Sequence, residues 1–561
     1  MLINRSGLLR ANLAGHALLA VLSATLAWHA GSRGFLPLDQ SIVFDAGYRI
    51  LSGQVPYADF FSPIGPVTFY VQAAAFLLGG VSYSTYIWTA AAMNVVGSVT
   101  TVLLLQHLSP RASVAPWVGG AVTAVWLTPP FGTPYPETTV LLIHLVAITL
   151  LVTKALEPTS TERVVTVTSL ACGVLEALAF LTKQNGAVFM SPLFPLLALL
   201  GAATRRAGLR VLLGMALGAG TGLALFLAWV AWHGAAAEFW RYFYTIPRAL
   251  GEIRLALPSR QMALQLFEPP HWTVALFGLS AMGGLLAGAW LHRGQLKEPW
   301  QAGVLVCYLY GYQNLFRLTV QNHWVVTLGL MGVLAGACCG AWEQVLRTLL
   351  GARMRMSWRR WMLATLVVAH VATGLVFLAE RGLRIAHTRE VHDIFETSTF
   401  TKRAHGATLA ALRWPESVVL GAEEIRPRDV GNLLKYLETR PGRLFVFPDW
   451  TILYGLTGRP APQPMLWFHR GVTYSYEYDR ALDARIVRSL EQSDVSIVVL
   501  ETDAMLASTR RRLRDFPLLR SYLRRRFRPV ERFGIFSVLM RDDVAGVDPL
   551  GRSADALDGV R

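Results

Sequence analysis

Three carboxylates stand close together in a polar stretch over residues 36–66: Asp39, Asp45 and Asp59. The stretch follows the first long apolar run, so it lies at the end of a membrane-embedded segment, where an acidic side chain is unfavourable unless it has a role. A carboxylate at this place can act as a general base that takes a proton from an acceptor hydroxyl or amine. The segment therefore predicts an active site at a membrane surface.

Each of the three acids also has a structural interpretation. Asp39 precedes a helical pattern of apolar residues and can be the N-cap of that helix. Asp45 precedes Arg49 by four residues, which is the spacing of an ion pair along a helix. Asp59 follows a proline by three residues and suits a turn, although it can also orient an acceptor or bind a cation. Asp39 is our first choice for the base, and either of the other two can replace it.

Polar residues that suit a substrate occur at the ends of other apolar runs. Glu137 opens one run, where an acid also meets the positive end of a helix dipole. Lys183 and Asn185 separate two further runs, and Arg317 and His323 lie in a later turn. Snorkelling explains a lysine at a span end, and a hydrogen-bonded interfacial histidine is the simpler interpretation of His323.

Basic side chains at these places also suit an anionic ligand. A phosphate at the bilayer surface accepts bidentate contacts from arginine and a point charge from lysine. The same reasoning covers the arginines of a long loop over about residues 233–271, which are Arg241, Arg248, Arg254 and Arg260.

Several catalytic signals are absent from the sequence. It contains no Walker A loop, no GxGxxG between a strand and a helix, no HExxH and no GxSxG. The 36–66 stretch has no Asp-x-Asp pair, which disfavours a metal-bridged nucleotide sugar. The four cysteines fall inside apolar runs and imply neither a disulfide framework nor a metal site. We therefore expect no metal and no cofactor, and a lipid phosphate as the leaving group.

The composition identifies the solvent of the protein. Of its 561 residues 53% are hydrophobic and 16% are charged, and the mean hydropathy is +0.40, which is too apolar for a soluble protein of this size. The formal charge of +16 would suggest nucleic acid in a soluble domain. Here the arginine clusters flank apolar runs, so we assign the charge to membrane topology and lipids, and expect no nucleic-acid partner.

The apolar runs predict an α-helical polytopic membrane protein with about eleven spans of roughly 20 residues. The first run resembles a signal peptide but is long enough to span, so we expect an uncleaved helix. A further apolar segment over residues 66–80 is short and begins with prolines, which favours an interfacial helix along the outer leaflet. The predicted spans cover about 11–31, 84–106, 113–128, 137–153, 164–181, 186–203, 208–232, 272–291, 300–315, 322–341 and 361–380.

Charge bias predicts the topology. Arg5 and Arg10 place the N-terminus in the cytoplasm. The basic loops near residues 205–210, 292–297 and 347–360 are expected to be cytoplasmic for the same reason. Eleven crossings satisfy this bias only if residues 66–80 do not cross. The region after residue 380 is then extracytoplasmic, and all the polar clusters named above fall on the outer face. Their convergence on one face is the main argument for a site there.

The sequence predicts two domains: a transmembrane catalytic domain over residues 1–382, with its first outer loop at 32–83, and an extracytoplasmic α/β domain over 383–561 with a disordered tail. Strands are expected at 417–420, 443–447, 495–500 and 533–540. Helices are expected at 481–492 and, rich in arginine, at 510–528.

The pattern resembles the GT-C superfamily of polytopic, lipid-phosphate-dependent glycosyltransferases, the group of protein O-mannosyltransferases and lipid A aminoarabinose transferases. The resemblance rests on Asp39, on Gly53 fourteen residues later, and on the segments 56–60 and 63–66. It extends to the run that Glu137 opens, to residues 180–185 and 317–323, and weakly to 453–459. In that superfamily the first outer loop carries an acidic residue, commonly within an acidic pair. By position this residue is Asp39, and Gln40 stands where the second acid would be.

The resemblance implies a polyprenyl-phosphate sugar donor whose phosphate is held by basic residues, here Lys183 and Arg317. We expect an integral-membrane glycosyltransferase of the cell envelope that transfers a sugar to a lipid, glycan or protein acceptor on the outer face of the plasma membrane. Asp39 would be the base, and Asp59, Glu137, Asn185 and His323 would contact substrates. One alternative is a lipid-linked glycan flippase or transporter, which predicts ionisable residues near the middle of spans, and none stands out. Another is a polysaccharide ligase or polymerase.

Overall fold

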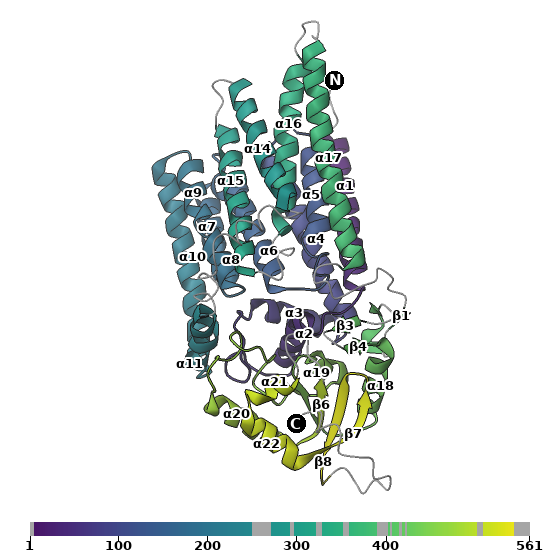
Figure 1. Cartoon of the computed structure of the whole chain (residues 1–561). Coiled ribbons are helices and arrows are strands. Elements are labelled where there is room, and N and C mark those ends of the chain that lie inside the picture. The colour runs from purple at the N-terminus through teal and green to yellow at the C-terminus, as the bar shows by residue number, and fades with distance from the viewer. Residues whose placement is uncertain are drawn as a thin grey trace. The chain divides into compact units, whose positions relative to one another are not determined.

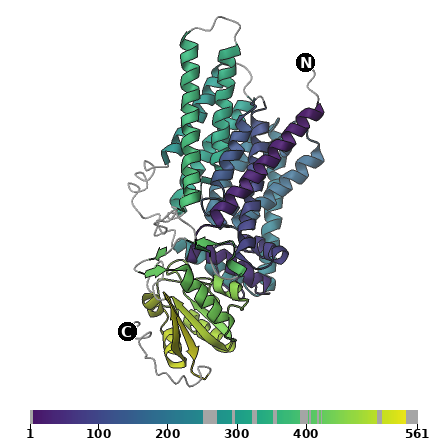
Figure 2. The ribbon, with the colours of Figure 1, turned by 90° about the vertical axis from the view of Figure 1, so that its right-hand side faces the viewer.

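The computed structural model is predominantly helical, with a small sheet in the C-terminal part of the chain (Figure 1, Figure 2). It describes residues 5–110, 112–249, 271–291, 297–320, 328–351, 358–389, 402–403, 407–414, 418–420, 423–501 and 509–543. The chain forms two compact units. The first consists of Met1–Gly31, Ala90–Phe226 and Ala256–Val391, and the second of Ser32–Thr89, Leu227–Leu255 and His392–Arg561. The predicted first outer loop thus belongs to the same unit as the C-terminal region.

Helices occur at all eleven positions where apolar runs predict spans. They are α1 (Arg5–Gly31), α4 (Tyr83–Leu108), α5 (Ala115–Trp126), α6 (Pro136–Leu150), α7 (Glu162–Phe180), α8 (Gln184–Met190) with α9 (Leu193–Gly201), α10 (Arg205–Trp232), α14 (His271–Leu291), α15 (Lys297–Val320), α16 (Met331–Gly351) and α17 (Trp358–Thr388). Within the described residues, eight helical stretches are long and apolar enough to cross a membrane. The chain is a multi-pass membrane protein, as predicted.

One predicted span is shorter than the sequence suggested. Helix α5 has 12 residues, which is about 18 Å of rise, whereas the hydrocarbon core is about 30 Å thick. The chain leaves the helix after Trp126 and enters a turn that contains Pro129 and Pro130. Proline lacks a backbone N–H and clashes with the preceding turn, so the helix ends there.

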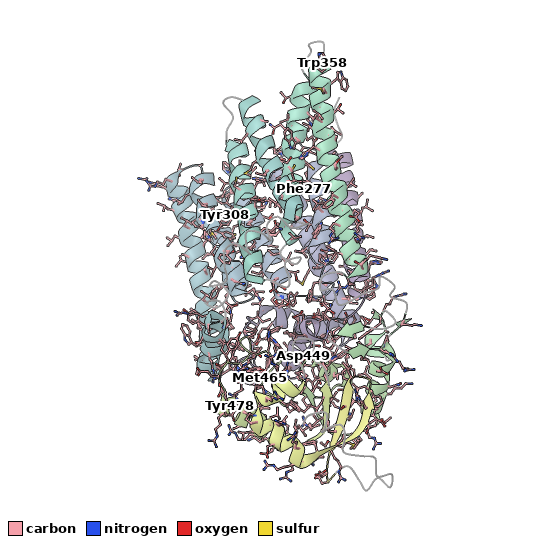
Figure 3. The ribbon with its side chains drawn as sticks, viewed as in Figure 1. Phe277, Tyr308, Trp358, Asp449, Met465 and Tyr478 are labelled. Carbon is pink, nitrogen blue, oxygen red and sulfur yellow. The ribbon has the colours of Figure 1, made fainter. Side chains whose placement is uncertain are left out.

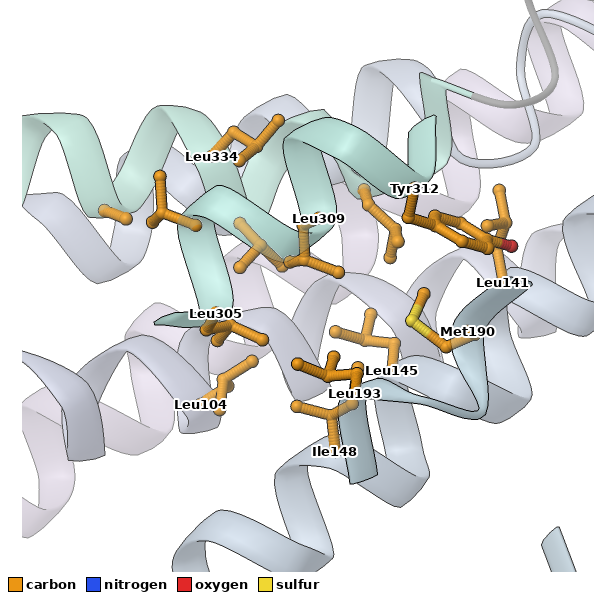
Figure 4. Close-up of a cluster of buried hydrophobic side chains, with 14 of the residues drawn as sticks. Leu104, Leu141, Leu145, Ile148, Met190, Leu193, Leu305, Leu309, Tyr312 and Leu334 are labelled. Carbon is orange, nitrogen blue, oxygen red and sulfur yellow. The ribbon is translucent and has the colours of Figure 1, made fainter. Parts of the chain in front are cut away.

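The core of the first unit is a continuous set of buried apolar side chains from α4 to α9 and from α14 to α17. Leu145 and Ile148 of α6 meet Leu193 of α9 and Leu305 and Leu309 of α15 (Figure 4). Met190 of α8 belongs to the same cluster. This packing fixes α6, α8 and α15 against one another, and these helices carry polar residues discussed below.

Small residues bring α5 and α16 into close contact. A Cβ atom added to Gly332 of α16 would lie 1.9 Å from Thr123 Oγ1 and 2.3 Å from the carbonyl oxygen of Gly119, both on α5. Only glycine fits at that distance, and such small-residue contacts are typical of helix pairs in membranes.

In the second unit, α2 (Pro37–Leu51) packs on α3 (Val67–Gly79). Phe44 meets Phe76 with ring centroids 4.8 Å apart, and Gly47 lies against Gln72. With 13 residues, α3 is about 20 Å long, too short to cross the bilayer, in agreement with the helix predicted over 66–80. Its position at the outer leaflet stays a prediction.

The C-terminal part of the second unit is a four-stranded sheet with helices. Its strands β5 (Arg443–Phe447), β6 (Val495–Glu501), β7 (Phe527–Phe533) and β8 (Phe536–Arg541) run in the order β5-β6-β8-β7. Strands β5 and β6 are parallel, and the other neighbours are antiparallel. Two short strand pairs precede this sheet: β1 (Lys402–Arg403) with β2 (Arg413–Trp414), and β3 (Val418–Leu420) with β4 (Glu423–Ile425). Helix α18 (Pro427–Glu438) connects β4 to β5. Helices α19 (Ile452–Thr457) and α20 (Arg480–Gln492) lie between β5 and β6 in the chain. The α/β character is as predicted, and the tail predicted to be disordered lies outside the described residues.

The predicted helix over 510–528 is wrong in part. The chain forms α21 (Thr509–Arg514) and α22 (Pro517–Arg526), separated at Pro517, and then enters strand β7. Proline suits the first position of a helix and cannot continue the preceding one. The strand predicted at 533–540 begins only at Phe536, because Gly534, with φ +56°, turns the chain between β7 and β8.

Candidate functional site

A buried ion pair joins two of the predicted site residues in the first unit. Glu137 lies in the first turn of α6, after Pro136, and Lys183 is the N-cap of α8. Lys183 Nζ lies 2.9 Å from Glu137 Oε1, and the side chains are 22% and 2% exposed. Glu137 Oε2 is buried and has no hydrogen-bond partner among the described residues. Lys183 is therefore held in place by a carboxylate before any ligand arrives.

A second pair lies further along the same helices and was missed in the sequence. His144 Nε2 of α6 lies 3.6 Å from Glu176 Oε1 of α7, and the side chains are 0% and 11% exposed. Ser191 Oγ, at the end of α8, donates to Glu176 Oε2 over 3.3 Å. The expectation that no ionisable residue stands out inside a span was wrong, because a lone histidine and a lone glutamate in separate apolar runs give no sign that they meet.

The two pairs are in register across α6 and the α7–α8 segment. His144 follows Glu137 by seven residues, and Glu176 precedes Lys183 by the same number, which is about two helical turns on each side. The acid is on α6 in the Glu137–Lys183 pair and on α7 in the His144–Glu176 pair. The Tyr312 ring of α15 stands edge-on to His144, with centroids 6.3 Å apart. These side chains together form a row of polar groups within the apolar core of the first unit.

Three further residues were predicted to contact a substrate: Asn185, Arg317 and His323. Asn185 Oδ1 accepts from the Gly186 N–H over 2.9 Å, within the first turn of α8. Arg317 belongs to α15, but its side chain is outside those described, and so are all atoms of His323.

In the second unit, Asp39 lies in the first turn of α2 and is 6% exposed. Leu36 is the N-cap of this helix, and its N–H donates to Gln40 Oε1 over 2.7 Å. The interpretation of Asp39 as the N-cap is therefore wrong. The helix begins earlier because Pro37 is preorganised for its first position. Asp39 is a buried acid in the first turn of α2, where the positive end of the helix dipole also favours a carboxylate.

The structural interpretation of Asp45 is confirmed. Its Oδ2 lies 2.9 Å from Arg49 Nε, and both side chains are buried. Arg49 also donates to the carbonyl oxygens of Gln463 and Met465, at 2.7 Å and 3.3 Å. Burial raises the pKa of the Asp45 carboxyl to about 6, and Arg49 opposes that rise. The pair anchors the segment around residue 465 to α2.

Asp59 is a turn residue, as the sequence favoured. It is exposed, and its Oδ2 accepts from the N–H of Val55 over 2.7 Å. The turn is fixed by Arg485 of α20, which donates to the carbonyl oxygen of Ala58 over 3.1 Å and stacks on Phe61. Arg485 also pairs with Glu238 at 2.9 Å. The first loop, the segment after α10 and α20 therefore meet in one junction.

The four arginines predicted in the long loop over residues 233–271 differ in their surroundings. Arg241, expected to bind an anion, pairs with Asp479 at the start of α20. Arg248 is exposed and lies beside Tyr244. Arg254 and Arg260 lie outside the described residues.

A carboxylate that the sequence analysis did not single out lies near Asp39. Asp449 follows β5, is fully buried, and its Oδ1 lies 2.7 Å from Arg512 Nη1 of α21 (Figure 3). Asp449 and Asp39 are close enough to repel each other electrostatically. Burial raises the pKa of the Asp449 carboxyl, Arg512 opposes that rise, and Asp39 adds to it.

Within the described part of the chain, no group of three or more His, Cys, Asp or Glu side chains is placed to hold a metal ion. The two polar centres are thus the Glu137–Lys183 ion pair with the His144–Glu176 contact in the first unit, and Asp39 with the Asp449–Arg512 ion pair in the second.

No protein-family model matches the chain, and neither does any curated protein. Among solved structures, it is similar to crystal structures of ArnT from Cupriavidus metallidurans. The apo state gives 12% identity and a TM-score of 0.51, covering 96% of this chain and 100% of that one. The state bound to undecaprenyl phosphate gives 12% identity and a TM-score of 0.49, covering 95% and 99%.

A third similar structure is the Archaeoglobus fulgidus oligosaccharyltransferase tethered to an acceptor peptide, with 10% identity, a TM-score of 0.47, and coverage of 93% of this chain and 73% of that one. We base the assignment of the fold on apo ArnT, whose TM-score exceeds 0.5. The chain therefore shares the fold of apo ArnT, in agreement with the fold that the resemblance in its sequence implies.

Proposed function

We propose that the protein is a membrane glycosyltransferase that moves a sugar from a polyprenyl phosphate to an acceptor on the outer face of the plasma membrane. The observation that carries this assignment is Asp39, a buried carboxylate in the first turn of α2 that is not needed to cap its helix, in a chain with the GT-C fold.

The reaction is a direct displacement at the anomeric carbon. The acceptor oxygen or nitrogen attacks that carbon, and the bond from the carbon to the phosphate oxygen breaks with its electron pair on the phosphate. Asp39 takes the acceptor proton and later releases it to water. Attack from the face opposite the leaving group inverts the configuration of the sugar.

Lys183 is the group we assign to the lipid phosphate. An ammonium has three N–H donors, so its contact with Glu137 leaves donors for phosphate oxygens. A cation at that place stabilises the negative charge that develops on the leaving phosphate. Glu137 then acts by holding Lys183. Arg317, Asn185 and His323 are further proposed contacts of the donor, and Asp59 of the acceptor.

Binding of the donor phosphate can be measured without knowing the sugar. We expect purified protein in nanodiscs to bind undecaprenyl phosphate, detected by native mass spectrometry. Lys183→Gln should weaken binding about tenfold, and Lys183→Arg less, because the charge is kept. Equal binding by wild type and Lys183→Gln would contradict the assignment.

Transfer is tested with radiolabelled undecaprenyl phosphates that carry a neutral hexose, an N-acetylated hexosamine or an aminopentose, with total membrane lipids and glycans as acceptors. The wild type should release undecaprenyl phosphate from one of them and pass the label to an acceptor. Asp39→Asn should reduce the rate at least about 100-fold, because the base is lost. Asp542→Asn, at an exposed carboxylate after β8, is the control. Near-normal transfer by folded Asp39→Asn would exclude Asp39 as the base.

A transporter is the second candidate, and the His144–Glu176 pair favours it. Ionisable residues buried between membrane helices mark proton or substrate pathways in transporters. The same labelled lipids separate the two functions, because a flippase moves the donor across the membrane and leaves the sugar–phosphate bond intact. Movement of whole glycans would instead indicate a ligase or polymerase.

The orientation is part of the same proposal. We expect the N-terminus and the loop between α9 and α10 to be cytoplasmic, and the C-terminal region to be outside. Alkaline phosphatase fused at the C-terminus should be active, and green fluorescent protein fused there after Sec export should be dark. The opposite pair of results would place the candidate site on the cytoplasmic face.

A further inference from the structure

Gln40 follows Asp39, so the start of α2 supplies no second carboxylate directly beside Asp39. The fold brings a second carboxylate to Asp39 from the C-terminal region. We propose that Asp449, held by Arg512, is a positioning residue of the acceptor site, whose negative charge beside Asp39 makes Asp39 a stronger base. This role rests on the function proposed above.

The path of the chain explains why Asp449 is near α2. Helix α19 packs directly on α2, because Gly455 lies against Phe44 and Tyr48, and a Cβ atom at that glycine would come within 2.8 Å of the Phe44 ring. The Trp450 ring lies tilted against the Phe35 ring, with centroids 5.4 Å apart. The residue before Trp450 is Asp449, and the segment after Phe35 enters α2 toward Asp39. Apolar contacts on both sides thus hold the segment of Asp449 next to the start of α2, and Asp39 acts electrostatically on Asp449.

Arg512 keeps the charge of Asp449 in this buried place. The pair is 4% and 0% exposed, and each partner has one further buried polar atom, Arg512 Nη2 and Asp449 Oδ2, without a hydrogen-bond partner among the described residues. A fully buried carboxylate without a counter-charge would take up a proton and lose its effect. Arg512 lowers the pKa of Asp449 and so opposes the uptake of a proton by that carboxylate next to Asp39.

Arg512 is distinguished from the arginines around it. Arg511 and Arg514, on the same short helix, are exposed, whereas Arg512 is buried. The arginine-rich segment therefore does not act as a uniform basic surface. One of its members is turned inward to a defined acid, which suits a role in the site.

The electrostatic effect on Asp39 has a definite sign. A neighbouring negative charge makes loss of a proton from Asp39 harder, so it raises the pKa of that acid, and a base of higher pKa accepts a proton more readily. The charged and titratable groups of the elements packed here set the background for this effect. They are Asp45, Tyr48 and Arg49 on α2, Tyr454 on α19, Arg512 on α21, and Tyr474 with its partner Asp515.

The experiment measures kcat/KM against pH with the labelled undecaprenyl phosphate that the wild type uses. Asp449→Asn keeps a polar partner for Arg512 but removes the charge. We expect the acid limb of the profile to move to lower pH by about one pH unit and kcat to fall about tenfold, with KM for the donor changed less than about twofold. Asp449→Glu, which keeps the charge, should restore most of kcat.

A second variant separates charge from structure. The double variant Asp449→Asn/Arg512→Gln replaces the ion pair by two amides and leaves no unpaired buried charge. If Asp449 only holds Arg512 in place, the double variant should recover the wild-type profile. In our account the acid limb of the double variant lies between those of the wild type and Asp449→Asn, because loss of the Arg512 charge offsets part of the loss of the Asp449 charge. This variant carries the test if Asp449→Asn alone does not fold.

Asp483→Asn is the matched control. Asp483 is also buried in the second unit and accepts from the N–H groups of Leu518 and Leu519, at 2.8 Å and 3.0 Å. Its removal should lower the thermal stability and leave the acid limb unchanged. An active wild type whose acid limb is the same in folded Asp449→Asn would overturn the role of Asp449 alone. A wild type that uses none of the donors would overturn the proposed function and this role with it.

Discussion

Lys183 and Glu137 form an ion pair at 2.9 Å, although one precedes α8 and the other opens α6. From the sequence, Lys183 was predicted to bind a phosphate. The structure shows that it already has an anionic partner, whose side chain is 2% exposed. Glu137 therefore fixes the ammonium, and the energetic consequences of removing either residue are unequal.

Lys183→Met should lower the stability more than Glu137→Gln does. Loss of the lysine leaves a buried carboxylate without a counter-charge, which costs about 3 kcal/mol. Loss of the acid leaves a lysine that is 22% exposed and can reach solvent. Unfolding in detergent, followed by circular dichroism, measures both. The double variant should be more stable than Lys183→Met, and equal losses in the two single variants would contradict this view of the pair.

His144 and Glu176 should be energetically coupled. We expect His144→Leu and Glu176→Leu to destabilise the protein singly, because each leaves a buried polar group without its partner. The double variant should be more stable than the sum of the two losses predicts, by about 1 kcal/mol, in the upper part of the range for such pairs in membranes. A double-mutant cycle on unfolding free energies measures this coupling, and a value of zero would show that the two side chains do not interact.

The stability should depend on pH through Asp45 in an unusual direction. Burial raises the pKa of its carboxyl from 3.8 to about 6, so between these values the folded protein binds more protons at this site than the unfolded chain does. The contribution of Asp45 to stability is therefore present at low pH and is lost as the pH rises through about 6. The difference in unfolding free energy between the wild type and Asp45→Asn, measured from pH 4 to 7, should fall along that range. A flat or rising difference would contradict the raised pKa.

Gly332→Ala should loosen the contact between α5 and α16. The new Cβ atom would overlap Thr123 Oγ1, at 1.9 Å, and forcing the helices apart costs about 1–3 kcal/mol. Gly220→Ala is the matched control, because this helical glycine has no atom within 4 Å of the added Cβ. The melting temperature should fall for Gly332→Ala and stay level or rise for Gly220→Ala. Equal behaviour of the two would mean that α5 and α16 are not in close contact.

Local sequence determined much of the architecture. An apolar run near 20 residues must satisfy its backbone hydrogen bonds internally in a bilayer, so it forms a helix whatever its neighbours are. For this reason helices occur at every predicted span. Prolines ended α5 early and separated α21 from α22. Both prolines are local features of the sequence, so these helix ends could also have been predicted.

Only the tertiary structure decided which polar residues meet. His144 and Glu176 are single ionisable residues within apolar runs, and their register depends on how α6 and α7 pack. Asp449 reaches Asp39 because α19 packs on α2, and the sequence cannot indicate that Arg512 turns inward while Arg511 and Arg514 face solvent. Residue types and short-range spacing fix helices and turns, because those depend on neighbouring residues. Contacts across tens or hundreds of residues depend on the shape of the packed core, which no local pattern contains.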